Sequence, residues 1–166
     1  AIEDRSFYEK KEFKNTVAYL KETGGRLHLA GLLSDQGIHG TTEHLYALLE
    51  LARRNGLKDV FIHCFLDGRD VPERSAKGFL TGLNQVINEK GVGKIVSIVG
   101  RYYAMDRDTN WDRTEVAYEL LTKGKGRYET DPFNALDHQY EEKPDLTDYY
   151  VDPITLTENG EPIATL

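Results

Sequence analysis

The chain has 166 residues, enough for one domain of ordinary size; its 39% hydrophobic content is enough for a core, and its aromatic content argues against disorder. A formal net charge of -7 excludes a broad nucleic-acid-binding surface, so any clustered arginines must act locally. No apolar run reaches the ~20 residues that cross a bilayer and no signal peptide is visible, so we expect no membrane contact. The single cysteine, Cys64, leaves no internal disulfide, and we expect a cytoplasmic protein.

Three apolar runs, each followed by a helical pattern, predict a β-α-β-α-β-α order with right-handed crossovers. The predicted strands cover residues 27–33, 60–66 and 94–100. The second run is almost wholly apolar, which is typical of a parallel strand covered on both faces. The sequence therefore predicts an α/β domain of three layers, with a mostly parallel sheet flanked by helices.

Helix signals surround these strands. We expect a first helix over about residues 7–20, followed by Gly24-Gly25 as a stop. The N-caps expected for the three later helices are Thr41 or Thr42, Asp70 and Thr109. Asp70 is followed three residues later by Glu73, which resembles a capping box.

The last forty residues have a different character. Residues 127–150 are polar and Tyr-rich without a clear period, and we expect them to be irregular. Asn159-Gly160 between apolar positions predicts a C-terminal type I′ hairpin. No linker is visible, so we expect one domain over residues 1–166. Because the chain starts without methionine and ends inside an apparent strand, we expect a piece of a longer protein.

Three polar segments follow the predicted strands directly. They are SDQGIHG at 34–40, LDGRD at 66–70 and GRYYAMDRD at 100–108. In a parallel α/β sheet such turns emerge at one edge, where ligands bind. We therefore expect one crevice to contain five side chains that are far apart in sequence: His39, Arg69, Asp70, Arg101 and Arg107. Three arginines in one crevice predict a small anionic substrate.

Each of these residues also has a plainer interpretation. Asp70 could be only an N-cap and Arg69 its solvated neighbour, and the segment alone leaves both possibilities open. The alternating charges after residue 100 could form a surface network of little energetic weight. Arg113 lies within a predicted helix, and we interpret it as an ion-pair partner. A histidine in a loop, such as His39, is more often a surface residue than a catalyst.

Other chemistry lacks support in the sequence. His28 and His63 lie within predicted strands, so we expect them to be buried and hydrogen-bonded. No histidine shows metal-ligand spacing, and neither a Walker A motif nor G-x-G-x-x-G is present, so we predict no metal or nucleotide site in this chain. Ser34 lacks the G-x-S-x-G elbow of a nucleophile.

The three turns and their flanking residues resemble one known family. The strings GLLSDQGIHGTTEHLYALLELA, VFIHCFLDGRDVPERSA and IVSIVGRYYAMDRDTNWDRTEVAYELL are similar to the cofactor-independent (2,3-bisphosphoglycerate-independent) phosphoglycerate mutases. The resemblance covers most of the chain. LDGRD together with GRYYAMDRDxxWDR is specific to this family.

The resemblance implies a two-domain isomerase that interconverts 3-phosphoglycerate and 2-phosphoglycerate in glycolysis and gluconeogenesis. One domain is phosphatase-like and holds two metal ions, usually manganese, and a serine that is phosphorylated in turn. The other is inserted into it, binds glycerate, and corresponds to this chain. Domain closure is then expected to exclude water.

By motif position, His39 is implied to lie near the transferred phosphoryl group, and Asp70 is a candidate general acid or base. The resemblance assigns Arg69 and Asp70 to the substrate hydroxyls and carboxylate. It assigns Arg101 and Arg107 to the anionic groups of the substrate.

The first turn departs from the family pattern SDGGVHSH, because Gln36 replaces a glycine and the second histidine is absent. A further motif, F-R-x-D-R, is expected beyond the hairpin in the full enzyme. Two alternatives remain open from the sequence: a non-catalytic module that binds an anionic metabolite, and a stand-alone hydrolase that uses Asp70 and His39. The hydrolase lacks an assigned nucleophile.

Overall fold

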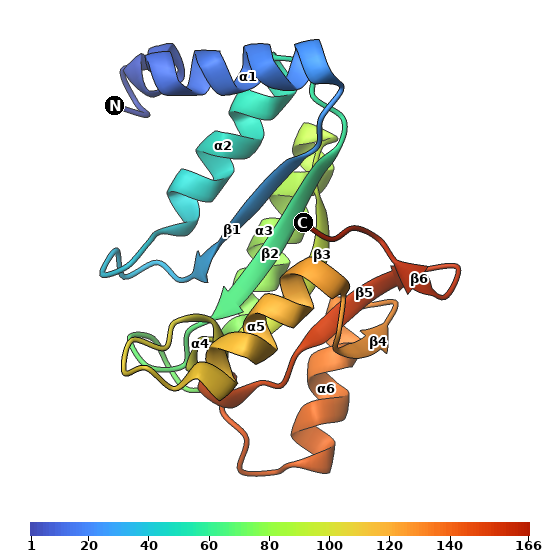
Figure 1. Cartoon of the computed structure of the whole chain (residues 1–166). Helices are drawn as coiled ribbons and strands as arrows, with labels where there is room; N and C mark the ends of the chain where they lie inside the picture. Colours follow the sequence, from blue (N-terminus) through green and yellow to red (C-terminus); the bar gives the residue numbers. More distant parts are fainter.

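A six-stranded sheet forms the centre of the molecule, in the order β1-β2-β3-β5-β4, with β6 paired to β5 (Figure 1). The computed structural model describes all 166 residues. The strands are β1 (Leu27–Leu33), β2 (Val60–Leu66), β3 (Lys94–Gly100), β4 (Arg127–Glu129), β5 (Ile154–Glu158) and β6 (Glu161–Pro162). The bounds of the first three match the predicted strands, and these three pair in parallel.

The sheet changes direction beyond β3. Strand β5 is antiparallel to β3, and β4 is parallel to β5. The predicted hairpin therefore contributes its first strand to the main sheet. Its turn residues Asn159 and Gly160 both have positive φ, 55° and 84°, as a type I′ turn requires.

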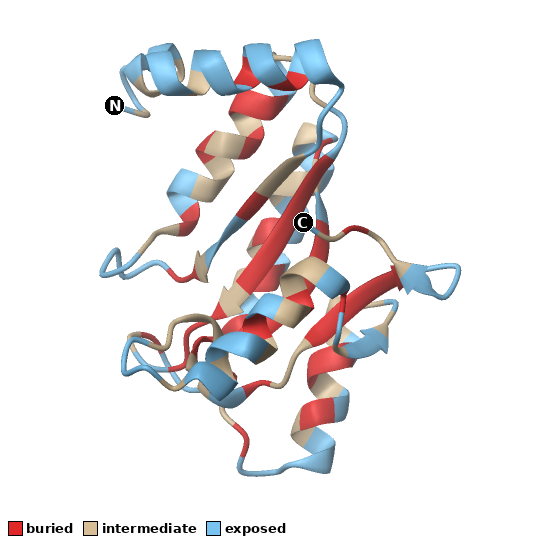
Figure 2. Cartoon of the chain, in the orientation of Figure 1, coloured by how far each residue is buried: buried red, intermediate tan, exposed pale blue.

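Helices cover both faces of the sheet. They are α1 (Lys11–Thr23), α2 (Thr42–Arg54), α3 (Ala76–Lys90), α4 (Arg101–Ala104), α5 (Trp111–Lys123) and α6 (Pro132–Glu142), with 3-10 turns η1 (Ser6–Glu9) and η2 (Asp148–Tyr150). The main core combines α2, α3 and α6 with one sheet face, while α5 lies across the other face in Figure 1. Buried residues follow the strands and the helix surfaces turned toward them (Figure 2). None of the helices combines the length and the apolar character needed to cross a membrane.

Several predicted helix starts are wrong. The first predicted helix is divided into η1 and α1, with Lys10 between them. Helix α3 starts at Ala76, not at Asp70, because the distant Asp148 carboxylate accepts the amides of Ser75 (2.7 Å) and Ala76 (2.8 Å). The cap expected at Thr41 is confirmed, since its hydroxyl accepts the Glu43 amide.

The start of α5 also differs from the expectation. Its N-cap is Asn110, and Thr109 has a left-handed backbone with φ 61°. The Asp106 carboxylate accepts the Asn110 amide at 2.9 Å, so Asp106 organises this turn in place of Thr109.

The prediction that residues 127–150 are irregular is wrong. They contain β4, α6 and η2. Asp131 caps α6 by accepting the amides of Phe133 (2.9 Å) and Asn134 (2.8 Å), and Pro132 occupies the first turn. Aspartate followed by proline is a helix-start signal, but few apolar residues follow it, so the helix has no strong period.

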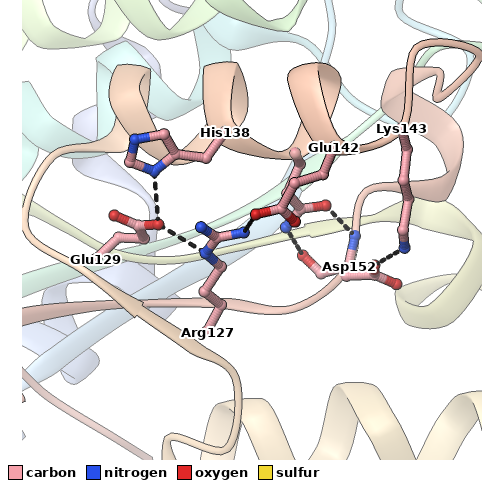
Figure 3. A network of polar contacts seen from close by, with 7 residues as sticks. Arg127, Glu129, His138, Glu142, Lys143 and Asp152 are labelled. Carbon is pink, nitrogen blue, oxygen red and sulfur yellow. Dashed lines mark hydrogen bonds and ion pairs between the residues drawn. The ribbon is translucent and has the colours of Figure 1, made fainter.

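A polar network links β4, α6 and the segment before β5 (Figure 3). Arg127 pairs with Glu129 (2.8 Å) on its own strand and with Glu142 (2.7 Å) on α6. Asp152 donates its amide to the side chain of Gln139 and pairs with Lys143. The hollow of about 570 Å³ beside this network is lined by charges that neutralise one another, so no ligand is assigned to it.

The η2 segment packs against the ends of β2 and β3. A Cβ at Gly68 would lie 2.6 Å from the backbone nitrogen of Tyr149, and one at Gly100 would lie 2.3 Å from its backbone oxygen. Gly68 also has a positive φ of 59°. Because these two glycines have no side chain, the backbone of η2 can pack directly against them. The η2 segment thereby supports the turns that follow β2 and β3.

Two strand histidines form a hydrogen-bonded row, as predicted, although only His63 is buried and His28 is half-buried. His28 Nδ1 lies 2.9 Å from His63 Nε2, and His63 Nδ1 lies 2.7 Å from the Ser97 hydroxyl. Burial, followed by the charge of His28, lowers the pKa of His63 to about 4. His63 is therefore neutral in the folded protein near pH 6.

This row predicts a specific pH dependence of stability. As pH falls, His63 takes up a proton in the unfolded chain at a higher pH than it does in the folded protein. The free energy of unfolding should therefore fall as pH drops from about 6.5 to 4, by up to roughly 3 kcal/mol from this group. His63→Leu has no such pH-dependent loss. The difference in free energy of unfolding between wild type and His63→Leu should therefore become smaller as pH drops from about 6.5 to 4. Urea titrations at several pH values measure it, with the exposed His44→Leu as the control. A deficit that stays constant with pH would contradict the assignment.

Candidate functional site

The turns after β1, β2 and β3 converge on one small cavity. Its volume is about 150 Å³. All five side chains that the sequence placed in one crevice line it, together with six others. The full lining is His39, Arg69, Asp70, Arg101, Tyr102, Met105, Asp106, Arg107, Asp108, Arg113 and Tyr149. The convergence follows from the parallel order of β1, β2 and β3, which brings their carboxyl ends to one edge.

His39 and Asp70 face one another across this cavity. His39 Nε2 lies 3.9 Å from Asp70 Oδ2, which is near enough for an ion pair when the imidazole is protonated. The Asp70 side chain is only 15% exposed, while His39 is exposed on the loop between β1 and α2. A carboxylate beside an imidazole can exchange protons with a bound hydroxyl group.

Arg101 opens α4 and is held firmly by two carboxylates. Its Nη1 donates to Asp67 Oδ1 at 2.6 Å and to Asp70 Oδ2 at 2.7 Å. The side chain is 7% exposed. Neither Nε nor Nη2 has a protein partner, so these donors remain available to an anion in the cavity.

Arg69 and Arg107 differ from Arg101 in their surroundings. Both are exposed at the cavity, and neither guanidinium has a carboxylate partner within the chain. Uncompensated guanidinium groups at the rim of a cavity are well suited to grip carboxylate or phosphate oxygens in bidentate fashion.

Asp106 fixes the loop that carries Arg107. Its carboxylate accepts the Asn110 side chain (2.7 Å) and the amides of Asn110 (2.9 Å) and Asp108 (3.2 Å). The Asn110 bond is the main reason that the pKa of Asp106 lies below its ordinary value. Arg113 lies 3.4 Å from Asp106 and stacks on the Tyr102 ring at 4.1 Å, which confirms it as an ion-pair partner.

Comparison with known proteins gives this site a family. The family model described as "BPG-independent PGAM N-terminus" matches residues 1–166. The chain belongs to this family. Its curated relatives include 2,3-bisphosphoglycerate-independent phosphoglycerate mutases from Moorella thermoacetica, 48% identical, and Acetivibrio thermocellus, 45% identical, each over all 166 residues. The chain spans 32% of the length of each of these relatives.

A solved structure agrees with the family assignment. It is described as "Crystal structures of Leishmania mexicana phosphoglycerate mutase at low cobalt concentration". It superposes with a TM-score of 0.94 at 30% identity, covering all of this chain and 32% of that one. The mutase N-terminal fold therefore includes the residues from β4 to η2 that the sequence had left without structure.

The residues of this mutase-family site that sequence reasoning missed include two tyrosines and one aspartate. Tyr149 lines the cavity from η2, within the stretch predicted to be irregular. Tyr102 lines it from α4, where the adjacent arginines dominated the interpretation. Asp67 lies behind the cavity, and its position directly after β2 in LDGRD was the available signal.

The chain contains no group of three or more histidine, cysteine, aspartate or glutamate side chains arranged to hold a metal ion. The carboxylates around the cavity are instead engaged by arginine side chains and backbone amides. The donor set of this family member therefore does not fit the metal pair that the resemblance implies.

Proposed function

We propose that this chain binds and orients the glycerate part of the substrate in a phosphoglycerate mutase that interconverts 3-phosphoglycerate and 2-phosphoglycerate. The observation that carries the proposal is the convergence of Arg69, Arg101 and Arg107 on one small cavity beside Asp70 and His39. Three guanidinium groups match the negative charges of a phosphorylated carboxylic acid. Membership of the family supports the same reaction.

The proposed roles follow from the contacts. Arg101, held by two carboxylates, offers its remaining donors at a fixed place. Arg69 and Arg107 are free to close on the carboxylate and the phosphate. Asp70 and His39 exchange protons with the substrate hydroxyls, because each oxygen must lose a proton when it takes the phosphoryl group and gain one when it releases it.

The remainder of the reaction belongs to the part of the enzyme outside this chain. We propose that a phosphatase-like domain supplies a serine that accepts the phosphoryl group from 3-phosphoglycerate and returns it to the 2-hydroxyl. That domain would also hold two metal ions, which we propose to be manganese, and the enzyme would act in cytoplasmic glycolysis. Glycerate would reorient between the two phosphoryl transfers while this chain holds it.

The binding role predicts a measurable effect of Arg107→Ala. Loss of one charge-assisted contact should weaken binding of 3-phosphoglycerate by roughly tenfold. The melting temperature should stay near that of wild type, because Arg107 is exposed and the substitution breaks no ion pair within the chain. Heteronuclear NMR titration with 3-phosphoglycerate measures the affinity. Lys58→Ala, which makes the same charge change in an exposed residue before β2, is the control. Equal weakening by both variants would show that only net charge matters.

We also expect the chain alone to have no mutase activity. It provides neither a metal-holding group nor an assigned nucleophile, so the phosphoryl group has no acceptor. A coupled assay that detects 2-phosphoglycerate formed from 3-phosphoglycerate measures this. Turnover that follows the pure chain through purification would overturn the expectation.

A further inference from the structure

Asp67 is a buried charged residue directly behind the candidate site, although it does not line the cavity. Its side chain is 1% exposed. One oxygen, Oδ1, accepts three donors: Arg101 Nη1 at 2.6 Å, the Asp70 amide at 3.0 Å and the Arg69 amide at 3.2 Å. A single buried oxygen therefore contacts the backbone or side chain of three cavity-lining residues.

The other oxygen of the same carboxylate has no hydrogen-bond partner. Asp67 Oδ2 is fully buried and unpaired. Burying a carboxylate with one oxygen unsatisfied is costly, and such groups in native proteins call for a functional reason. An asparagine would accept the same two backbone amides through its own oxygen, so turn geometry alone does not require the charge at this position.

The charge acts on Arg101. Burial raises the pKa of Asp67, but the bonds from the Asp70 amide, Arg101 and the Arg69 amide outweigh it, so the pKa lies below its ordinary value. Asp67 is therefore an anion at neutral pH, directly behind a guanidinium that is itself 7% exposed. Arg101 Nη1 donates hydrogen bonds to two carboxylates, which fixes the plane of the guanidinium group. Its free Nε and Nη2 donors therefore keep one orientation.

We propose that Asp67 is a positioning residue of the glycerate site, which fixes the guanidinium plane of Arg101 while it holds the turn that presents Arg69 and Asp70. The role of the site in glycerate binding rests on the function proposed above. The fixing of Arg101 does not, because it is a property of the chain without ligand. Fixed donors distinguish a ligand of matching shape from any other anion, whereas loose donors respond mainly to charge.

The first test follows the Arg101 guanidinium by NMR without ligand. In wild type, the Nη protons of Arg101 should give separate, slowly exchanging resonances because rotation about the guanidinium bonds is restricted. In Asp67→Asn, which keeps the side-chain shape but replaces the charge-assisted bond to Arg101 with a weaker neutral one, these resonances should merge while the Arg69 and Asp70 amide shifts stay near their wild-type values. Separate Arg101 resonances that persist in Asp67→Asn would overturn the proposal.

Asp106→Asn is the matched control. It makes the same change in a carboxylate that is 3% exposed at the same cavity, but its arginine partner is Arg113. This variant should change the Arg113 resonances and leave those of Arg101 in place. Loss of the Arg101 signature in both variants would mean that any lost carboxylate loosens the site, which would contradict the specific role of Asp67.

The second test compares two anions. If Asp67 positions Arg101, then Asp67→Asn should reduce the preference for 3-phosphoglycerate over inorganic phosphate by roughly tenfold, with phosphate bound as well as before or better. Equal changes in both affinities would reveal a purely electrostatic role and overturn the proposal. If wild type shows no preference for 3-phosphoglycerate, the glycerate function fails, while the guanidinium resonances still decide whether Asp67 fixes Arg101.

Discussion

Gly100→Ala is expected to destabilise the chain by about 3 kcal/mol, near the upper end of the range for overpacking. A Cβ at this position would lie 2.3 Å from the backbone oxygen of Tyr149 and 2.8 Å from the backbone nitrogen of Val151. Neither atom can rotate away, because both belong to the main chain, and the Gly100 amide already donates to the Val151 oxygen at 2.8 Å. The η2 segment must therefore move as a unit.

The backbone of Gly100 makes this variant a clean steric test. Its φ of -66° and ψ of 146° suit alanine, so the expected loss comes from the contact and not from conformational strain. Thermal and urea unfolding measure the stability, and a fall of roughly 10 °C in melting temperature is expected for a domain of this size. Because Tyr149 lines the cavity, binding of 3-phosphoglycerate should weaken as well.

The matched control for this variant is Gly78→Ala. Gly78 is exposed within α3, and a Cβ there meets nothing within 4 Å. Removing a glycine from a helix interior should stabilise the chain by roughly 0.5–1 kcal/mol. The two substitutions add the same methyl group, so opposite signs would isolate the contact with η2. Wild-type stability in Gly100→Ala would show that η2 does not press on the end of β3.

The parallel half of the sheet could be predicted from sequence because its signals are local. Strands buried on both faces appear as short apolar runs, and the glycine after each helix marks its end. Gly24, Gly91 and Gly124 all adopt the left-handed conformation that ends a helix. The meeting of the polar turns at one edge then follows from parallel order alone, without knowledge of any contact.

The supports of the site could not be predicted in this way because they act across long stretches of sequence. Asp148 caps α3 from 72 residues away, and it supplies the bonds that the local signal had assigned to Asp70. Gly68 and Gly100 are close to η2, which lies in a stretch without periodicity. A sequence shows that a glycine permits close approach, but not which partner approaches it.

The same distinction applies to the charges of the site. Sequence position placed Arg101 at the strand end and Arg113 on a helix, and the ion-pair role of Arg113 is confirmed. The pattern of alternating charges could not reveal that Arg101 pairs with Asp67 and Asp70 from the neighbouring turn. Pairing depends on which side chains are buried together, and Asp67 after β2 is buried against Arg101 after β3.

Arg101→Met is expected to have the largest effect on both stability and binding. Methionine fills a similar volume but leaves the Asp67 carboxylate, 1% exposed, without its only charged partner. Removing one member of a buried ion pair typically costs about 3–5 kcal/mol. Binding of 3-phosphoglycerate should fall below detection, because the donors of Arg101 disappear together with the orientation of Asp70. Chemical unfolding and NMR titration measure the two effects.

The pH dependence identifies the cause of that loss. In wild type the pKa of Asp67 is lowered, so its contribution to stability is present above about pH 4 and is lost as pH falls further. Without Arg101, one of the bonds that offset burial is lost, so the pKa of Asp67 should be higher than in wild type. The stability deficit of Arg101→Met should therefore shrink as pH falls into the acid range, because the carboxyl then takes up a proton in the folded variant at a higher pH than in wild type.

A double variant separates the buried charge from simple loss of packing. Arg101→Met combined with Asp67→Asn removes both charges, so it should recover most of the stability that the single change removes. It should not recover binding of 3-phosphoglycerate, since no guanidinium returns to the cavity. If the double variant is as unstable as Arg101→Met at every pH, the unpaired Asp67 charge is not the source of the loss, and the packing of Arg101 between β2 and α4 must account for it instead.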